Sequence, residues 1–347
     1  MSNLPWDLVF QANEPDRSAQ DRPTLRIFWA RAARPSWWLI GLTTIILVAG
    51  CTIGPFKYGD WVVTLNRLAF VVVFLGGAIS LSNRGYLRSA LAFESVAVTL
   101  AVAFTIPGLS TMAASLDMPY QDAALLAADR TLGFDWRAIV EWTRDRPDLS
   151  VTLSYVYKSL LWQPLILFPL LARYNPERLR RVLGTSTVAL LITIAVFTFV
   201  PAQTGYVYLG YTHADFPDMR TNTAWGVAHI LNAIRAGERQ LSLNGLVTFP
   251  SYHAVGAMLL AYGWLAIPAL RWIFVPVNIL MLFSCVPIGS HYVVDVFGGM
   301  ALALVCYPAV SRYFATTDAG TTSWPSRHLT ATANTPLPAE RSLPQVV

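Results

Sequence analysis

The chain has 347 residues, of which 54% are hydrophobic and only 13% are charged, and its formal net charge is +5. Soluble domains carry about 25% charged residues, so this composition excludes an ordinary soluble protein and indicates a membrane protein. All three cysteines fall inside apolar runs and none forms a CxxC pair, which argues against a disulfide framework and a cysteine metal site. We attribute the positive charge to membrane sidedness rather than to nucleic-acid binding.

The apolar runs predict an all-α polytopic membrane protein with about eight transmembrane helices. The runs are about 18 to 22 residues long, which is enough to cross a bilayer of about 30 Å as helices. The predicted helices cover residues 37–55, 62–81, 88–107, 151–172, 183–203, 251–269, 271–289 and 291–313.

These elements divide the chain into four parts. Residues 1–36 are polar and arginine-bearing, and we expect a cytoplasmic arm without a cleaved signal peptide. Residues 37–87 are expected to form two additional transmembrane helices, and residues 88–313 a six-helix catalytic membrane domain. Residues 314–347 are rich in Thr, Ser, Pro and Ala, which predicts a disordered cytoplasmic tail.

The loop 108–150 contains two short amphipathic pieces, Ala123–Leu132 and Asp135–Thr143. Its acids and its tryptophans, Trp136 and Trp142, suit a cap that lies on the outer membrane interface. A solvated connector fits the same pattern, and both interpretations stay open.

The connections on one side of the predicted membrane hold most of the arginines that lie near the spans. The positive-inside rule therefore places both termini in the cytoplasm and the loops 108–150 and 204–250 outside. This orientation does not use the histidines, yet it places His253 and His291 at the same outer face. Because the loop 204–250 leads directly to His253, we expect it to cover the site.

Two histidines and one carboxylate carry the candidate chemistry. His253 follows Pro-Ser-Tyr, whereas His291 and Asp295 are four residues apart, so on a helix they share a face and the carboxylate can orient the imidazole. Ionisable groups near hydrocarbon are unfavourable unless they are paired or used. We expect His291 to attack phosphorus and become a phosphohistidine, with Asp295 supporting its charge and His253 as general acid and then base.

Ser251 and Gly289 are candidate phosphate-binding residues beside these histidines. Ser251 opens a predicted helix whose free N–H groups suit an anion, and its hydroxyl can donate to a phosphate oxygen; a plain N-cap fits as well. Gly289 lets the backbone approach an anion closely, and a simple turn between helices is the alternative.

These residues resemble the type 2 phosphatidic acid phosphatase superfamily, whose second motif is Pro-Ser-x-His and whose third is Ser-Arg-x5-His-x3-Asp. The likeness covers roughly residues 88–313 and implies a six-helix phosphatase-like core. Carried over residue by residue, it implies that His253 is the general acid, His291 the nucleophile and Asp295 its orienting partner. Ser284 stands at the serine of the third motif.

The sequence departs from that pattern at three basic positions. Cys285 stands at the third-motif arginine, and Thr193 and Val200 stand at the two basic positions of the first motif, Lys-x6-Arg-Pro. A phosphomonoester carries nearly two negative charges and a diester only one, so fewer cations favour a diester. This pattern, and the run Gly-x-His-Tyr-x-x-Asp-Val from Gly289 to Val296, is similar to the inositol phosphorylceramide synthase and sphingomyelin synthase branch.

Three further residues are candidates for binding the phosphate. Tyr292 belongs to the run shared with that branch. Lys158 is expected about two turns inside its helix, deep enough to need a partner, although it can also snorkel to the interface. Arg235 precedes the second motif and can equally be a solvated loop residue.

We therefore expect an integral-membrane lipid phosphatase or phosphotransferase in a bacterial inner or plasma membrane, with its site facing the periplasm or exterior. The reaction expected is transfer of a phosphorylated head group, as in an inositol phosphotransferase; hydrolysis of a lipid or polyprenyl phosphate is the alternative. The expected partners are a lipid phosphate or phospholipid and the bilayer, with no cofactor, metal, nucleic acid or obligate protein partner. Two other classes stay open: a metal-dependent membrane enzyme and a proton-coupled transporter, although transporter sites lie at the bilayer midplane.

Overall fold

The structure is a computed structural model that describes residues 34–53, 61–220, 223–238 and 245–319. Most of the predicted N-terminal arm and of the predicted tail lies outside the described residues. The elements, in chain order, are α3 (Arg34–Ile53), α4 (Trp61–Asn83), α5 (Leu87–Ala114), α6 (Asp122–Thr131), α7 (Trp136–Arg144), α8 (Pro147–Lys158), the 3-10 turn η3 (Ser159–Leu161), α9 (Gln163–Tyr174), α10 (Pro176–Phe199), α11 (Gly205–Tyr208), the 3-10 turn η4 (His213–Asp215), α12 (Thr223–Arg235), α13 (Tyr252–Trp264), α14 (Arg271–Ser284) and α15 (Val293–Ala319).

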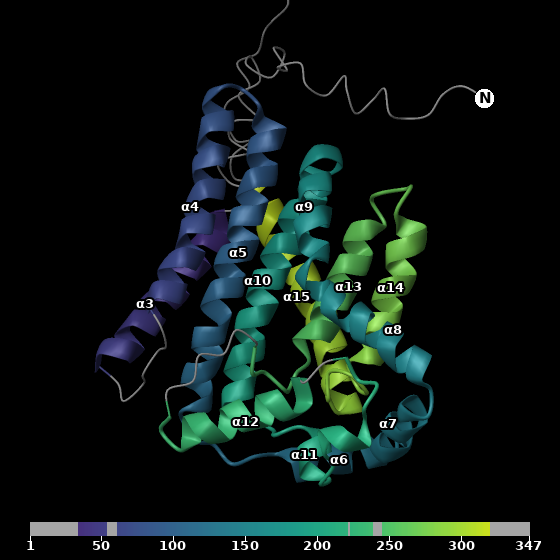
Figure 1. The fold of residues 1–347 in the computed structure, drawn as a ribbon. Helices are drawn as coiled ribbons and strands as arrows, with labels where there is room; N and C mark the ends of the chain where they lie inside the picture. Colours follow the sequence, from purple (N-terminus) through teal and green to yellow (C-terminus); the bar gives the residue numbers. More distant parts are fainter. Residues whose placement is uncertain (1–33, 54–60, 221–222, 239–244, 320–347) are drawn as a thin grey trace, which may run out of the picture.

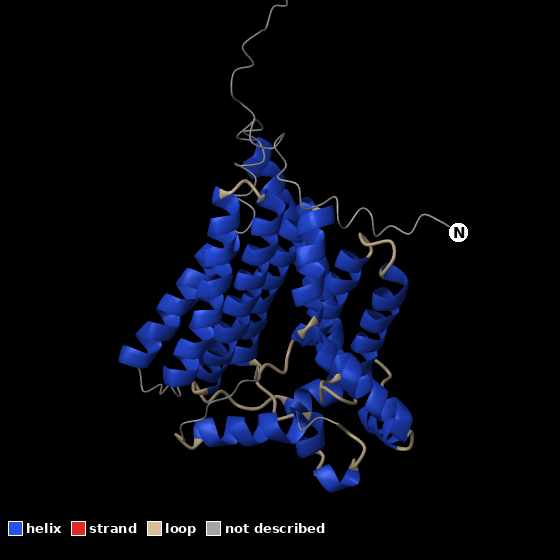
Figure 2. Cartoon of the chain, turned by 45° about the horizontal axis from the view of Figure 1, so that its top comes forward, coloured by secondary structure: helices blue, strands red, loops and turns tan. Residues whose placement is uncertain are grey.

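The long helices form a bundle, and the short helices cover one end of it. Figure 1 shows α6, α7, α11 and α12 gathered below the bundle, and we call these four helices the cap. Within the bundle, α5 contacts α4, α9 and α10, and α13 contacts α10, α14 and α15. Figure 2 shows the same division, with helices as the only regular elements among the described residues.

Among the described residues, three helices are long and apolar enough to cross a membrane, namely α5, α10 and residues Val293–Thr317 of α15. The helices α13 and α14 have 13 and 14 residues, which gives about 20 Å at a rise of 1.5 Å per residue against a hydrocarbon core of about 30 Å. The predicted all-helical fold is confirmed for the described residues. The count of eight spans and the cytoplasmic placement of the termini stay predictions.

The predicted single helix 151–172 is wrong, because the structure interrupts it at η3 and starts a new helix, α9, at Gln163. Pro164 lacks the N–H that would bond to the preceding turn. The Gln163 side chain is fully buried, and its Oε1 accepts hydrogen bonds from Trp264 Nε1 (2.9 Å) and Asn278 Nδ2 (2.8 Å). The break thus places an amide where it joins α9 to α13 and α14.

Several predicted helix ends are also wrong: α10 begins at Pro176 instead of residue 183, and α13 and α14 end at Trp264 and Ser284 instead of residues 269 and 289. We expected one helix to end at Pro107, but α5 continues through it to Ala114, and the hydroxyls of Ser110 and Thr111 both donate to the Pro107 carbonyl. A proline removes one backbone donor, and a membrane helix tolerates it where neighbouring groups satisfy the backbone. The last helix, expected to end at residue 313, continues to Ala319.

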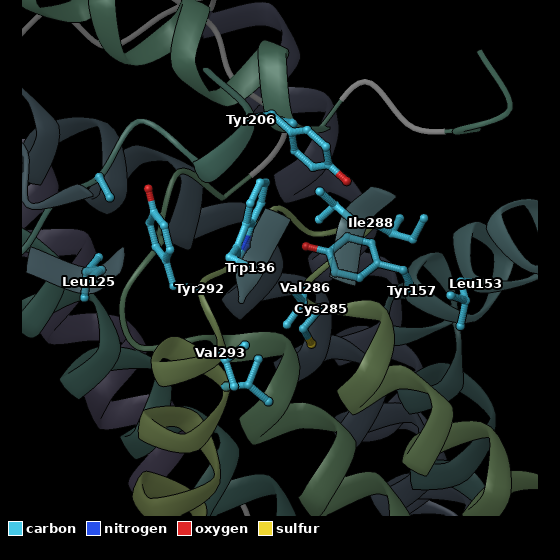
Figure 3. Packing of buried hydrophobic residues seen from close by; sticks show 14 of the residues in the cluster. Leu125, Trp136, Leu153, Tyr157, Tyr206, Cys285, Val286, Ile288, Tyr292 and Val293 are labelled. Carbon is cyan, nitrogen blue, oxygen red and sulfur yellow. The ribbon is translucent and has the colours of Figure 1, made fainter. Parts of the chain in front are cut away.

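The cap is packed on the bundle through an aromatic cluster (Figure 3). The fully buried Trp136 meets the Tyr206 ring edge-on with a centroid distance of 5.0 Å, and the Tyr206 hydroxyl donates to the Pro287 carbonyl at 2.6 Å. A Cβ on Gly205 would lie 2.5 Å from the Trp136 ring, so this contact requires glycine. The loop 108–150 is therefore packed on the bundle and is not a solvated connector, whereas its position on the outer membrane interface stays a prediction.

The buried Gln163 amide generates a stability prediction. We expect Gln163→Ala to lower the free energy of unfolding, because the Trp264 and Asn278 donors would lose a buried acceptor, at a cost of about 1–3 kcal/mol for each unsatisfied group. Thermal unfolding of the purified protein in detergent measures this. The matched control is Gln121→Ala, because the Gln121 side-chain amide donates only to the nearby Pro119 carbonyl at the surface. Equal unfolding temperatures for the two variants would contradict the prediction.

Candidate active site

The structure brings together the three residues that the sequence analysis ranked first. His253 lies in the first turn of α13, and His291 lies two residues before α15, whose first turn contains Asp295. The centroids of the two imidazole rings are 6.4 Å apart. The Nδ1 atom of His291 lies 3.3 Å from Oδ2 of Asp295. His291 is 5% exposed and Asp295 is fully buried.

Asp295 fixes both the ring and the backbone of the His291 segment. Its Oδ2 atom also accepts the backbone N–H of Tyr292 at 2.9 Å, so one carboxylate oxygen caps the helix and faces the imidazole. Its carbonyl accepts the backbone N–H of Ser251 at 2.9 Å, which ties the start of α13 to the start of α15. Because Nδ1 of His291 faces Asp295, Nε2 is the ring nitrogen left for a substrate.

Tyr157 orients the second imidazole, a role that the sequence analysis missed. Its ring stacks on His253 with a centroid distance of 3.8 Å and an interplanar angle of 13°. A Cβ on Gly289 would lie 2.5 Å from the Tyr157 ring and 2.6 Å from the carbonyl oxygen of Cys285. Gly289 therefore serves close packing beside the site. No motif indicates the Tyr157 contact, because the tyrosine comes from α8.

Two of the candidate phosphate-binding residues have structural partners. The fully buried Ser251 accepts the Ala254 N–H at 3.3 Å, which is the N-cap alternative left open from the sequence. The hydroxyl of Tyr292 donates to Oδ1 of Asp122 in the cap at 2.9 Å, and its ring is buried.

The two candidate cations are also held by structural contacts. Arg235 pairs with Asp117 at 3.2 Å and lies over the Tyr120 ring at 3.5 Å, and these contacts tie α12 to the segment after α5. The exposed Lys158 follows Tyr157 in the chain and donates to the Arg220 carbonyl at 2.6 Å. The structure thus gives Arg235 an anchoring contact away from the histidines and leaves Lys158 at the edge of the site.

The three positions that depart from the family pattern carry no cation and little exposed surface. Thr193 and Cys285 are fully buried, and Val200 is partly buried against the aromatic cluster of the cap. The Cys285 thiol donates to the Met281 carbonyl at 3.2 Å.

The cap binds the backbone of the nucleophile candidate and of the first two residues of α15. Asp129 of α6 accepts the backbone N–H groups of Val293 (2.9 Å) and Val294 (2.8 Å), so it caps α15 from another helix. The Trp136 indole donates to the carbonyl of His291 at 2.9 Å. Burial raises the pKa of Asp129, and its two backbone hydrogen bonds oppose that shift.

The sequence analysis missed these cap contacts, although one signal was present. Asp122 and Asp129 are seven residues apart on an amphipathic helix, so they lie on one face. That periodicity predicts two inward-facing carboxylates but does not reveal their partners on α15. Within the described residues, no group of three or more His, Cys, Asp or Glu side chains is arranged to hold a metal ion.

Residues 123–309 match the family model of the PAP2 superfamily, and this segment is more than half of the chain. It begins in α6 and ends in α15, so it contains the cap helices and all three site residues. No curated protein and no solved structure matches the chain. Together with the three membrane-length helices, the match indicates a membrane enzyme of the lipid phosphatase type.

Asp129 generates the first prediction for the site. We expect Asp129→Ala to destabilise the protein by about 0.5–2 kcal/mol, the usual cost of removing a helix N-cap, and to lower turnover by displacing His291. Asp129→Asn keeps one acceptor oxygen and should therefore retain part of the stability and part of the turnover. Thermal unfolding and kcat are the measurements. The control is Asp145→Ala, an exposed residue of the α7 C-terminus; a wild-type unfolding temperature for Asp129→Ala would refute the capping role.

Gly289 generates a second prediction. Gly289→Ala should lower the free energy of unfolding by about 1–3 kcal/mol, as overpacking does, and should lower activity, because the new methyl group must displace the Tyr157 ring from His253. Gly226→Ala is the matched control, because nothing lies within 4 Å of a Cβ at that position. Equal unfolding temperatures and equal turnover rates for the two alanine variants would show that the close contact with Tyr157 does not require glycine at residue 289.

Proposed function

The chain belongs to the PAP2 superfamily, and we propose that it transfers a phosphorylated head group from a phospholipid to the hydroxyl of an acceptor lipid. The site faces the periplasm or exterior, and the reaction passes through a phosphohistidine at His291. The observation that carries the proposal is the convergence of His253, His291 and Asp295, from two separate helices, around one small space.

The distance between the two imidazoles suits an in-line displacement. A centroid separation of 6.4 Å leaves room for one phosphorus atom, because a reacting nitrogen lies about 3–3.5 Å from it before attack. Nε2 of His291 attacks phosphorus, the P–N bond forms, and the P–O bond to the diacylglycerol oxygen breaks. Protonated His253 gives its proton to that leaving oxygen, while Asp295 stabilises the positive charge on the His291 ring.

The second half of the reaction restores both histidines. Neutral His253 takes the proton of the acceptor hydroxyl, and the acceptor oxygen attacks phosphorus. The P–N bond then breaks, and His291 returns to its neutral form. Water in place of the lipid hydroxyl gives hydrolysis by the same steps, so the two reactions differ only in the acceptor.

Two observations favour transfer of a diester-linked head group. Thr193, Val200 and Cys285 replace the three cations of the superfamily motifs, and a phosphodiester needs fewer cations than a terminal phosphate because it carries one negative charge. In addition, His291 is 5% exposed, and a site that limits access of water favours transfer over hydrolysis.

The deciding experiment supplies the purified enzyme with phosphatidylinositol labelled in its phosphate, with and without a long-chain lipid alcohol. We expect the label to move to a second lipid only when the alcohol is present. A phosphatase would instead release inorganic phosphate from labelled phosphatidic acid or labelled polyprenyl phosphate and would transfer nothing from phosphatidylinositol. That result would overturn the proposal.

Variants test the assigned roles. His291→Ala should abolish turnover and the acid-labile protein-bound label, because no P–N bond can form. His253→Ala should lower kcat by about 10²- to 10⁴-fold, the usual contribution of general acid–base catalysis. The control is His229→Ala, an exposed residue of α12. Wild-type turnover in His291→Ala would show that the nucleophile is another residue.

A further inference from the structure

The cap contains a cleft of about 450 Å³ between α6 and α7. Gly133, with φ +85°, makes the tight turn that joins the two helices. The cleft is lined by two arginines, one aspartate and three apolar side chains, namely Arg130, Arg137, Asp135, Leu126, Phe134 and Leu209. It is thus a polar opening with an apolar wall.

The two arginines give this cleft an excess of positive charge. Neither guanidinium forms an ion pair with a described carboxylate, and Arg137 lies 5.4 Å from the Tyr211 ring centroid. The Asp135 carboxylate is engaged as the N-cap of α7, where it accepts the Ala138 N–H at 3.2 Å. Arg137 lies in the first turn of α7, where the helix dipole disfavours a cation. The helix dipole therefore does not favour Arg137 at this position, whereas an anion bound in the cleft would.

The apolar wall of the cleft continues onto an exposed apolar side chain of α15. Phe134 contacts Phe297 of α15 with a ring centroid distance of 5.8 Å, and the two side chains are 36% and 43% exposed. A phospholipid fits this arrangement, because its phosphate can lie on the arginines while its chains follow the apolar side chains of α15. Phosphate is also the group that guanidinium binds with paired hydrogen bonds.

Two residues that line the cleft are direct chain neighbours of residues that contact the His291 segment. Asp129, which holds the N–H groups of Val293 and Val294, directly precedes Arg130. Trp136, which holds the carbonyl of His291, directly precedes Arg137. A ligand in the cleft therefore contacts the neighbours of the two residues that position His291.

We infer that this cleft binds the phosphate of an anionic lipid through Arg130 and Arg137, as a docking subsite for the substrate. The inference deepens the proposed function and depends on it for the identity of the lipid. The class of ligand is a phosphate-bearing anion, and it can be carried by a lipid or be free in solution. The arginines are positioning residues, because no reacting atom lies at the cleft.

Binding is tested in the His291→Ala background, where turnover does not interfere. The full-length protein in detergent is titrated by calorimetry with short-chain phosphatidylinositol and, separately, with inorganic phosphate. We expect Arg130→Gln together with Arg137→Gln to weaken binding of short-chain phosphatidylinositol at least tenfold. The charge-matched control is Arg144→Gln together with Arg146→Gln, at the other end of α7, which should bind as the parent protein does.

The outcomes distinguish a phosphate carried by a lipid from a free phosphate, and they distinguish failure of the cleft proposal from failure of the proposed transfer reaction. Weaker binding of the phospholipid supports the lipid subsite, whereas weaker binding of inorganic phosphate alone overturns it in favour of a free-phosphate site. Unchanged binding of both ligands overturns the cleft as a phosphate site. In the enzyme with His291 intact, the paired variant should raise KM for the phospholipid with kcat unchanged. Because binding is measured without turnover, failure of the transfer reaction leaves this test valid.

Discussion

The start of α15 is largely buried and must satisfy its backbone N–H groups there, and the site depends on how it does so. The first N–H groups of a helix have no partner within the helix, and leaving one buried and unpaired costs about 1–3 kcal/mol. Here Asp295 accepts the N–H of Tyr292, and Asp129 accepts those of Val293 and Val294. Since Asp129 belongs to the cap, the position of His291 is a property of the cap as well as of the bundle.

The same arrangement decides where a phosphate can bind. A helix N-terminus attracts anions through its free N–H groups and its dipole. At α15 the Asp129 carboxylate already occupies that position, so a phosphate there would meet a negative charge. At α13 the cap is the neutral hydroxyl of Ser251. For the proposed reaction, the electrostatics therefore favour a phosphate on the α13 side, beside His253.

The sequence predicts those parts of the structure that depend on local spacing. The apolar runs predict most helices, and the spacing of His291 and Asp295 predicts their contact, although His291 precedes the helix. What spacing cannot predict are contacts between distant segments. Asp129 and Val293 are 164 residues apart, and Tyr157 reaches His253 from a helix with no recognised motif. Such contacts depend on how helices pack, and the spacing of residues in a single sequence does not encode that packing.

The cap also bears on the choice between a lipid hydroxyl and water. Water is far more concentrated than any lipid alcohol, so a transferase must keep water away from the P–N bond until the acceptor has bound. On the side of the cap, the Trp136 indole donates to the His291 carbonyl and its ring packs on Tyr206, and His291 is 5% exposed. Under the proposed function, an acceptor lipid would approach along α15, where the exposed Phe297 contacts Phe134. Easier approach from a membrane than from solvent is the asymmetry that the proposed head-group transfer would require.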